Sequence, residues 1–184
     1  MKHTISNFLK VYFVIPVIFL SIFITAATAP AELLKKGKII ELKQIHCMAE
    51  NIFYEARKEP QEGQAAVARV VVNRVKHGFA DTPCKVIYQK TQTDNGGKVC
   101  QFSWVCEGKG SPNRKDPGYL NALQISYEVL AFDAYKDVIP KSTLFFHNLS
   151  VVPAWSYDKV KRIGNHIFYS RKPYATKKPQ YASR

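Results

Sequence analysis

The sequence predicts one domain that is mainly α-helical with a small β element. The length of 184 residues suits a single domain. Three segments repeat apolar residues at helical spacing, and two short runs near the C-terminus are rich in β-branched and aromatic residues. Neither an internal repeat nor an internal linker interrupts them. The domain is therefore expected to occupy residues 39–170.

The first 29 residues have the composition of an export signal. Lys2, His3 and Lys10 precede a run of 21 uncharged, mostly apolar residues, 11–31. A small-x-small cleavage site ends at residue 29, but Pro30 disfavours cleavage there, and the run is long enough to span a bilayer. Residues 1–29 are predicted to be a signal peptide or a signal anchor, followed by a connector over 30–38. The domain is then exported to the periplasm or cell envelope, and an uncleaved signal would anchor it in the inner membrane.

The chain is strongly basic, with 27 Lys and Arg against 14 Asp and Glu and a formal net charge of +13. Such a charge favours polyanionic partners. An exported protein meets cell-wall polymer and phospholipid head groups first, so nucleic acid is not expected as a partner. Membrane contact is expected only through an uncleaved N-terminal segment. Much of the excess lies in residues 171–184, which have no apolar periodicity and are predicted to be a disordered basic tail.

Four cysteines in an exported chain suggest two disulfides, with three possible pairings. Cys100 and Cys106 enclose a short loop that a bridge could close, which leaves Cys47 with Cys84. The spacings match no familiar zinc pattern. Neither a metal nor another cofactor is expected.

Two helices are predicted in succession. Over 39–58 the apolar residues recur at i, i+3, i+4 and i+7, and a second helix follows with Pro60 as its first residue and Gly78 just past its end. A third helix is expected over 119–135, with its core-facing stripe on Leu120, Leu123, Tyr127, Leu130 and Ala131.

The remaining segments are shorter. Residues 79–98 and 109–118 are turn-rich, with a short helix or strand over 85–88. Residues 99–106 are expected to be a strand or an extended loop. Residues 143–147 and 165–169 are β-like.

Glu55 is the candidate catalytic residue. It lies beside the apolar stripe of the first helix and directly after Phe53 and Tyr54, where burial would raise its pKa. A carboxylic acid with a raised pKa is the proton donor that cleavage of a glycosidic bond needs. The other acids nearby are expected to be solvated or to cap helices: Glu50, Glu59 and Glu62.

No second carboxylate is evidently paired with Glu55, although most glycosidases use two at set distances. Four acids elsewhere in the sequence are candidates for that role: Asp94, Glu107, Asp116 and Asp158. The simpler hypothesis is a single acid that protonates the glycosidic oxygen. As a base it then takes a proton from the sugar's own 6-hydroxyl to give an anhydro product. With water as the nucleophile, the same acid would give hydrolysis.

Residues 101–104 (QFSW) are the second candidate site, because aromatic faces stack on sugar rings and Gln and Ser bond hydroxyl and amide groups. The alternative is a strand that turns Phe102 and Trp104 into the core. His147 and His166 end or interrupt the β-like runs. With an acid they could hold zinc, but no His-Glu-x-x-His motif is present. The predicted substrate-binding set is Tyr54, Gln101, Phe102, Ser103, Trp104, His147, Trp155 and His166.

Several runs together resemble the SleB-type cell-wall hydrolases. Residues 49–75, including NIFYEARKEP, resemble the opening motif of that family. Residues 84–89 and 100–104 resemble its middle, and residues 163–169 (IGNHIFY) resemble its closing motif. The resemblance extends over residues 46–170, and the order of the pieces makes it specific.

The resemblance implies a lysozyme-like α+β fold and cleavage of peptidoglycan glycan strands between N-acetylmuramic acid and N-acetylglucosamine. The spore-germination members are lytic transglycosylases, and their catalytic glutamate maps to Glu55. Lys58 departs from the glycine usual in the Glu-Ala-Arg-Gly-Glu motif. Two alternatives remain: a zinc N-acetylmuramoyl-L-alanine amidase and a non-catalytic wall-binding module. An envelope partner that regulates activity is a further expectation.

Overall fold

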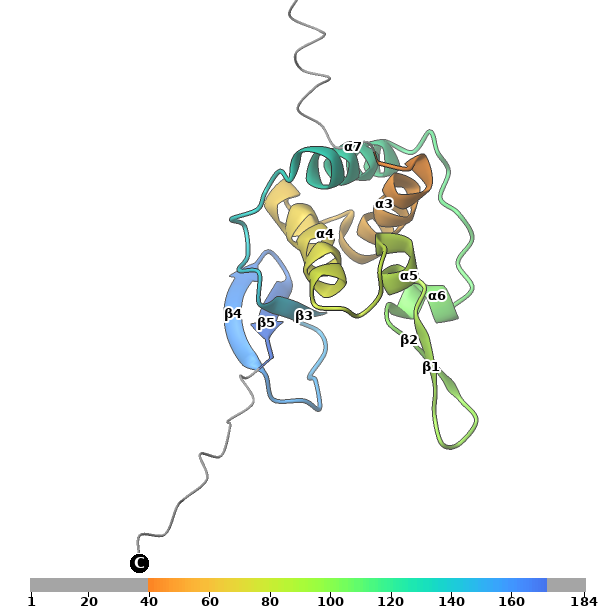
Figure 1. The fold of residues 1–184 in the computed structure, drawn as a ribbon, viewed down its shortest axis with the longest axis vertical. Coiled ribbons are helices and arrows are strands. Elements are labelled where there is room, and N and C mark those ends of the chain that lie inside the picture. Colours follow the sequence, from red (N-terminus) through yellow and green to blue (C-terminus); the bar gives the residue numbers. More distant parts are fainter. Residues whose placement is uncertain (1–39, 172–184) are drawn as a thin grey trace, which may run out of the picture. The chain divides into compact units, whose positions relative to one another are not determined.

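The computed structural model describes residues 40–171. The predicted leader, the connector, Ile39 and residues 172–184 of the tail lie outside the described residues. Within 40–171, no helix has the length and apolar character needed to cross a membrane. The elements run, in order, α3 (Leu42–Ala56), α4 (Gln61–Lys76), α5 (Pro83–Ile87), β1 (Lys90–Gln92), β2 (Lys98–Cys100), α6 (Ser103–Cys106), α7 (Pro117–Phe132), β3 (Thr143–Asn148), β4 (Asp158–Ile163) and β5 (His166–Ser170) (Figure 1).

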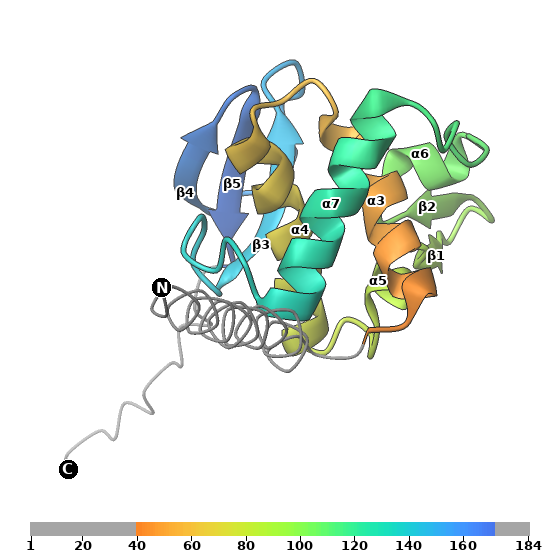
Figure 2. The same ribbon diagram turned by 90° about the horizontal axis from the view of Figure 1, so that it is seen from above.

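Helix α3 is the centre of the helical part and contacts α4, α5 and α7 (Figure 2). Its inner side buries Met48, Ala49 and Ile52 completely, and the fully buried Ala65, Ala68 and Val71 of α4 belong to the same core cluster. Small side chains let the two helices approach closely. Residues 57–60 connect the end of α3 to the start of α4 in a tight turn, called the elbow below. The elbow matters because Glu55 lies at the end of α3.

The elbow differs in detail from the sequence prediction. Helix α3 ends at Ala56, and Pro60 is the N-cap residue of α4 rather than its first residue. Lys58 is exposed and is not among the residues with positive φ, so this turn does not require the glycine that the family motif carries. At the other end of α4, Gly78 has a φ of +76° and terminates the helix as predicted.

A three-stranded antiparallel sheet, in the order β3-β5-β4, packs on the other side of α4. Phe168 and Ile163 from this sheet form a second core cluster with Ala56, Val67 and Val70. Strands β4 and β5 are joined by a two-residue turn, Gly164–Asn165, because Ile163 pairs directly with His166. The sheet and the helices therefore meet at the elbow between α3 and α4.

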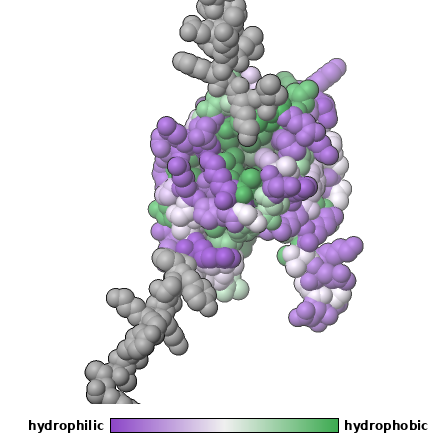
Figure 3. All heavy atoms as spheres, viewed as in Figure 1, coloured by the Kyte–Doolittle hydropathy of each residue, from purple (hydrophilic) through white to green (hydrophobic). Residues whose placement is uncertain are grey.

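Strand β4 and the β1–β2 hairpin were not predicted. Both hairpin strands are mostly exposed, and the hairpin extends from the rest of the domain with a largely hydrophilic surface (Figures 1 and 3). Residues 103–106, expected to be extended, form the short helix α6.

Two predictions about which side chains are buried were wrong. On α7, Leu120 and Tyr127 are 50% and 46% exposed, and the buried side is Tyr119, Ala122, Ile125 and Val129. This helix is apolar around most of its circumference, so its periodicity did not single out the buried face. Glu50 and Glu59 are buried rather than solvated. Each has a tertiary hydrogen-bond donor, from the hydroxyl of Tyr88 and from Asn165 respectively, which sequence spacing cannot show.

Both predicted disulfides are confirmed. Cys47–Cys84 joins α3 to α5, and both of its cysteines are buried. Cys100–Cys106 joins the end of β2 to the end of α6 and encloses residues 101–105. The first bridge thus links distant parts of the helical core, whereas the second shapes one short segment.

Removing the two bridges separately should destabilise the domain unequally. Loop-closure entropy predicts losses of about 4 kcal/mol for Cys47→Ala/Cys84→Ala and about 2 kcal/mol for Cys100→Ala/Cys106→Ala, because the first bridge closes the longer loop. Urea unfolding of both double variants beside the native chain measures this difference. Equal losses would contradict the assignment of Cys47–Cys84 as the main covalent support of the core.

Candidate active site

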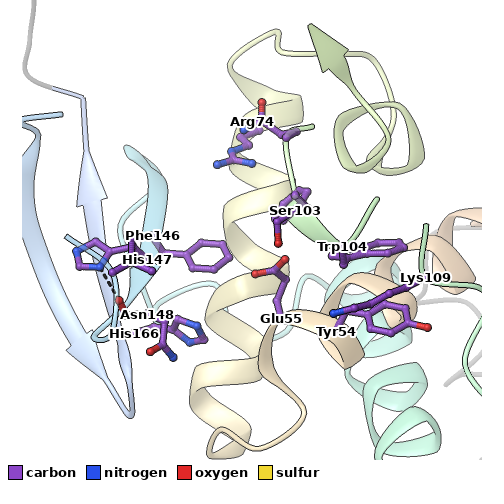
Figure 4. A pocket seen from close by; sticks show the side chains of 13 residues that line it. Tyr54, Glu55, Arg74, Ser103, Trp104, Lys109, Phe146, His147, Asn148 and His166 are labelled. Atoms are coloured by element: carbon purple, nitrogen blue, oxygen red, sulfur yellow. Dashed lines mark hydrogen bonds between the residues drawn. The ribbon is translucent and has the colours of Figure 1, made fainter. Parts of the chain in front are cut away.

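A pocket of about 330 Å³ lies between the helical part and the three-stranded sheet. The end of α3, helix α4, the segment 101–104 and Lys109 form one side, and β3 with the residues around it forms the other (Figure 4). The lining residues are Tyr54, Glu55, Arg74, Gln101, Phe102, Ser103, Trp104, Lys109, Phe146, His147, Asn148, Val151 and His166.

The Glu55 side chain projects into the middle of this pocket (Figure 4). No described residue hydrogen-bonds to its carboxyl group. Burial, which favours the neutral acid, raises the pKa of Glu55 to about 7, and the negative charge of Glu107 acts in the same direction. The positive charges of Arg74 and Lys109 oppose this rise. The carboxyl group is therefore close to half-protonated at neutral pH, and it is free to bond to a ligand.

Arg74 supplies a fixed positive charge to the pocket. It is 4% exposed, and its Nε donates to the carbonyl of Leu144 at 2.8 Å. With the Gln101 amide turned to satisfy both groups, its oxygen accepts from Arg74 Nη1 at 2.9 Å. Burial lowers the pKa of Arg74 to about 10, which still leaves it charged at neutral pH. Arg74 thus ties α4 to β3 and to the segment 101–104 while facing Glu55.

Tyr54 and Trp104 form an aromatic wall. Their rings stack at 4.8 Å, and Trp104 Nε1 donates to the Asn51 side chain at 3.0 Å. The hydroxyl of Tyr54 donates to the carbonyl of Gly110. Phe102 and Trp104 are each only 4% exposed. Their predicted burial in the core is confirmed, although residues 103–106 form a helix and not a strand. Their remaining surface lines the pocket, and sugar binding by these residues stays a prediction.

The opposite wall carries Phe146, whose ring points toward Glu55, and the two predicted histidines (Figure 4). His147 Nδ1 donates to the carbonyl of Asn148 at 2.8 Å, so its Nε2 accepts from the hydroxyl of Tyr169 at 2.9 Å in the neutral ring. His166 is 2% exposed and its Nδ1 has no partner. Burial lowers the pKa of His166, against the opposing charge of Glu59. Both rings are thus positioned by the sheet.

Of the predicted substrate-binding residues, only Trp155 is not in the lining. Its ring packs on Tyr157 at 4.8 Å and on Tyr169 at 5.0 Å, and it touches His147 edge-on from behind the wall. Sequence reasoning missed five lining residues: Arg74, Lys109, Phe146, Asn148 and Val151. They come from a helix interior, a loop and a strand, and no local pattern distinguishes them.

Glu55 is the only carboxylic acid that lines the pocket in the part of the chain that the structure describes. Glu107 acts on it through space but is half-exposed and paired with Lys109 at 2.7 Å. The other acids considered as partners lie elsewhere, with Asp94 in the β1–β2 hairpin, Asp116 as the N-cap of α7 and Asp158 in β4. Across residues 40–171, no group of three His, Cys, Asp or Glu side chains is arranged to hold a metal ion.

A lone acid with a raised pKa, facing aromatic walls in a cleft between helices and a small sheet, is typical of enzymes that cleave glycosidic bonds. The family model for cell wall hydrolases matches residues 58–169, which begin just after Glu55. The chain belongs to the cell wall hydrolase family.

Two curated relatives are spore cortex-lytic enzymes. The one from Oceanobacillus iheyensis is 30% identical over 131 residues, and the one from Bacillus subtilis is 28% identical over 129 residues. Each alignment covers 67% of this chain but only 40% and 36% of the respective relative. The chain therefore spans well under half the length of these relatives.

Two solved structures have the same fold. The catalytic domain of Bacillus cereus SleB matches with a TM-score of 0.51 and 24% identity, covering 72% of this chain and 94% of that domain. The catalytic domain of the germination-specific lytic transglycosylase SleB from Bacillus anthracis matches with a TM-score of 0.51 and 25% identity, covering 71% and 97%. The α+β fold expected from the sequence is confirmed, since the similarity extends over nearly all of both domains.

Charge changes at the rim of the pocket should move the pKa of Glu55 in opposite directions. Glu107→Gln removes a negative charge and should lower it, whereas Lys109→Met removes a positive charge and should raise it. Carbon-13 NMR titration of the Glu55 carboxyl group measures both shifts. Glu62→Gln, an exposed site on α4, is the matched control and should leave the pKa unchanged. Shifts in the same direction would contradict this electrostatic description.

Glu55 should also make the domain less stable as the pH rises. Its pKa in the folded state, about 7, lies above its ordinary value of 4.5, so between these values the folded state binds more protons than the unfolded state. Stability is then lost as the pH rises through this window. Glu55→Gln should remove the loss and gain on the order of 1–3 kcal/mol over the native chain between pH 4 and pH 8. Urea unfolding at both pH values measures the gain, and an equal difference at both would refute it.

Proposed function

We propose that this protein cleaves peptidoglycan glycan strands between N-acetylmuramic acid and N-acetylglucosamine, with Glu55 as both acid and base. The observation that carries the proposal is the Glu55 carboxyl group, which projects into the pocket with a pKa of about 7 and has no hydrogen-bond partner in the described part of the chain. A group with this pKa can donate a proton in one step and accept one in the next at neutral pH. Membership of the cell wall hydrolase family supports peptidoglycan as the substrate.

In the proposed reaction, the Glu55 carboxyl group carries out both proton transfers. Protonated Glu55 gives its proton to the oxygen that links C1 of the muramic acid to C4 of the glucosamine, and the C1–O bond breaks. The carboxylate then takes the proton of the muramic acid 6-hydroxyl as O6 bonds to C1. The products are a 1,6-anhydromuramic acid end and a free 4-hydroxyl, and Glu55 is protonated again without water being consumed.

One feature of the pocket favours this lytic transglycosylase reaction over hydrolysis, and a second supports proton donation by Glu55 in either reaction. Among the described residues Glu55 is the only acid in the lining, whereas glycosidases that use water generally place two carboxylates at set distances. Arg74 and Lys109 provide positive charge that stabilises the carboxylate left after the first proton transfer. The related Bacillus anthracis protein is described as a lytic transglycosylase, which agrees with this choice.

The other lining residues are suited to holding a sugar chain. Tyr54, Phe102 and Trp104 offer aromatic surface for sugar rings. The polar groups proposed to bond hydroxyl and acetamido groups are Gln101, Ser103, Asn148, His147 and His166. Trp155 is assigned a supporting role, because it packs behind His147.

The proposed site of action is the cell wall outside the cytoplasm, reached through the N-terminal export segment. The net charge of +13 suits an anionic wall. Anchoring by residues 1–29 and control by an envelope partner remain proposals, as do the two alternative functions. For the amidase alternative, the described residues offer no three-residue metal site.

Glu55→Gln should abolish release of soluble muropeptides from purified peptidoglycan, because glutamine cannot donate the proton. The native chain should release products with 1,6-anhydromuramic ends, detected by mass spectrometry. Glu62→Gln, also on a helix but exposed and away from the pocket, should retain full activity.

Each other outcome identifies a different function. Reducing muramic ends would mean hydrolysis, and freed peptides would mean an amidase. Binding to insoluble wall without product release would mean a wall-binding module. Activity retained by Glu55→Gln would remove Glu55 from the mechanism.

A further inference from the structure

A second glutamate, Glu59, joins the helical elbow to the sheet. Its Oε2 accepts the backbone N–H of Asn165 at 2.8 Å, and its Oε1 accepts from the Asn165 side chain at 3.2 Å. Glu59 is buried although Asn165 is exposed, so these two bonds satisfy a carboxylate that is largely removed from water. The turn it holds, Gly164–Asn165, connects β4 to β5.

The backbone of Glu59 is itself fixed on the helical side. Its N–H donates to the carbonyl of Ala56 at 2.9 Å, which folds it back onto the end of α3. Its carbonyl accepts from the Gln64 side chain at 3.0 Å, and Gln64 in turn accepts from Asn121 of α7 at 3.0 Å. Glu59 is therefore connected through hydrogen bonds to three helices and to the sheet.

The turn is shaped to receive this carboxylate. Gly164 has a φ of +55°, and a Cβ atom placed on it would lie 2.0 Å from Glu59 Oε2. Glycine is thus required here both for the backbone conformation and for the space that Glu59 occupies. Gly78 has a similar φ of +76° but nothing within 4 Å of such a Cβ. Alanine substitutions at Gly164 and Gly78 can therefore separate the effect of backbone strain from the effect of the contact with Glu59.

The two ends of this link stand next to the two sides of the pocket. Glu55 lies four residues before Glu59, in the last turn of α3 on the helical side. His166 follows Asn165 directly, and Phe146 of β3 packs on the His166 ring with centroids 5.2 Å apart. Phe168 of β5 also contacts Phe146, at 5.7 Å. A shift of the turn would therefore move the wall that faces Glu55.

We propose that Glu59 is a positioning residue, which sets the spacing between the Glu55 carboxyl group and the pocket wall made by Phe146 and His166. This inference rests on the proposed function. Misplacement of reacting groups by about 1 Å can cost on the order of 100-fold in rate. Loss of the link also admits water to Glu55, whose raised pKa depends on burial.

Two variants break the link from opposite sides. Glu59→Ala removes the carboxylate, and Gly164→Ala pushes against it. Both should lower kcat on solubilised glycan strands by about 10- to 100-fold with a smaller change in KM. Gly78→Ala carries similar backbone strain without the contact and should keep kcat within about twofold. Glu59→Gln retains the size and one acceptor and should recover much of the rate. If Glu59→Ala does not fold, the comparison of Gly164→Ala with Gly78→Ala supplies the test.

The pH profile separates positioning from a general loss of stability. Activity requires protonated Glu55, so it falls on the alkaline side as Glu55 ionises. In Glu59→Ala and Gly164→Ala this alkaline limb should move to lower pH, because a wetter Glu55 has a pKa nearer 4.5. The other charged or titratable groups around Glu55 stay in place in both variants: Arg74, Glu107, Lys109, His147 and His166. Glu59→Ala also removes the charge that opposes the lowering of the His166 pKa, whereas Gly164→Ala keeps that charge, so a shift shared by both variants reports on Glu55. All rates are taken below the unfolding temperature of each variant.

A double variant completes the test. Once Glu59→Ala has removed the carboxylate, the nearest remaining neighbour of a Cβ at residue 164 is Pro60 Cδ at 3.0 Å. Adding Gly164→Ala to Glu59→Ala should therefore lower kcat by a much smaller factor than Gly164→Ala does in the native chain. Native kcat and an unmoved alkaline limb in the folded Glu59 and Gly164 variants would overturn the inference, as would equal losses from Gly164→Ala and Gly78→Ala. Failure of the proposed function gives a different result, since Glu55→Gln would then remain active or the native chain would release no anhydro ends.

Discussion

The partial burial of the Glu55 carboxyl group, without a hydrogen-bond partner among residues 40–171, is the constraint on which the rest of the site depends. An acid removed from water shifts toward its neutral form, and a partner inside the protein would normally stabilise the charge again. Here that partner is missing, and the pKa rises to about 7. The folded state is therefore less stable at neutral pH, but the Glu55 carboxyl group keeps a proton that it can transfer to a substrate.

The surroundings keep this shift moderate. Arg74 is buried and held by the carbonyl of Leu144, so its charge cannot move away from Glu55. Lys109 and Glu107 form a pair at the rim and act on Glu55 in opposite directions. A group that must serve as acid and then as base needs this balance. Burial alone would hold the proton too tightly, and the positive charges alone would remove it.

The acid also has to face a wall that comes from a distant part of the chain. Glu59 and Asn165 are over 100 positions apart in sequence, yet their two hydrogen bonds close the gap between the elbow and the sheet. Gly164 leaves room for that contact. Local strand pairing builds the hairpin. Its position relative to Glu55 is fixed by this long-range contact together with the packing of Ile163 and Phe168 against Ala56, Val67 and Val70.

The sequence by itself determined the helices α3 and α4 and the β-like runs at 143–147 and 165–169. It also suggested the two disulfide pairings and Glu55 as the candidate acid. These follow from periodicity, turn residues and spacing, which act over a few neighbouring residues. It also led to most of the pocket lining, through the family motifs.

Only the tertiary structure decided which face of α7 is buried, that Glu59 is a structural link and that Arg74 faces Glu55. Those properties depend on which surfaces meet across the chain. The sequence around an apolar residue such as Leu120 is the same whether or not another helix covers it. A carboxylate such as Glu59 gains its hydrogen-bond partner only when the β4–β5 hairpin packs next to the elbow. The physical reason is that burial and long-range hydrogen bonding are properties of the assembled domain and have no signature at short sequence range.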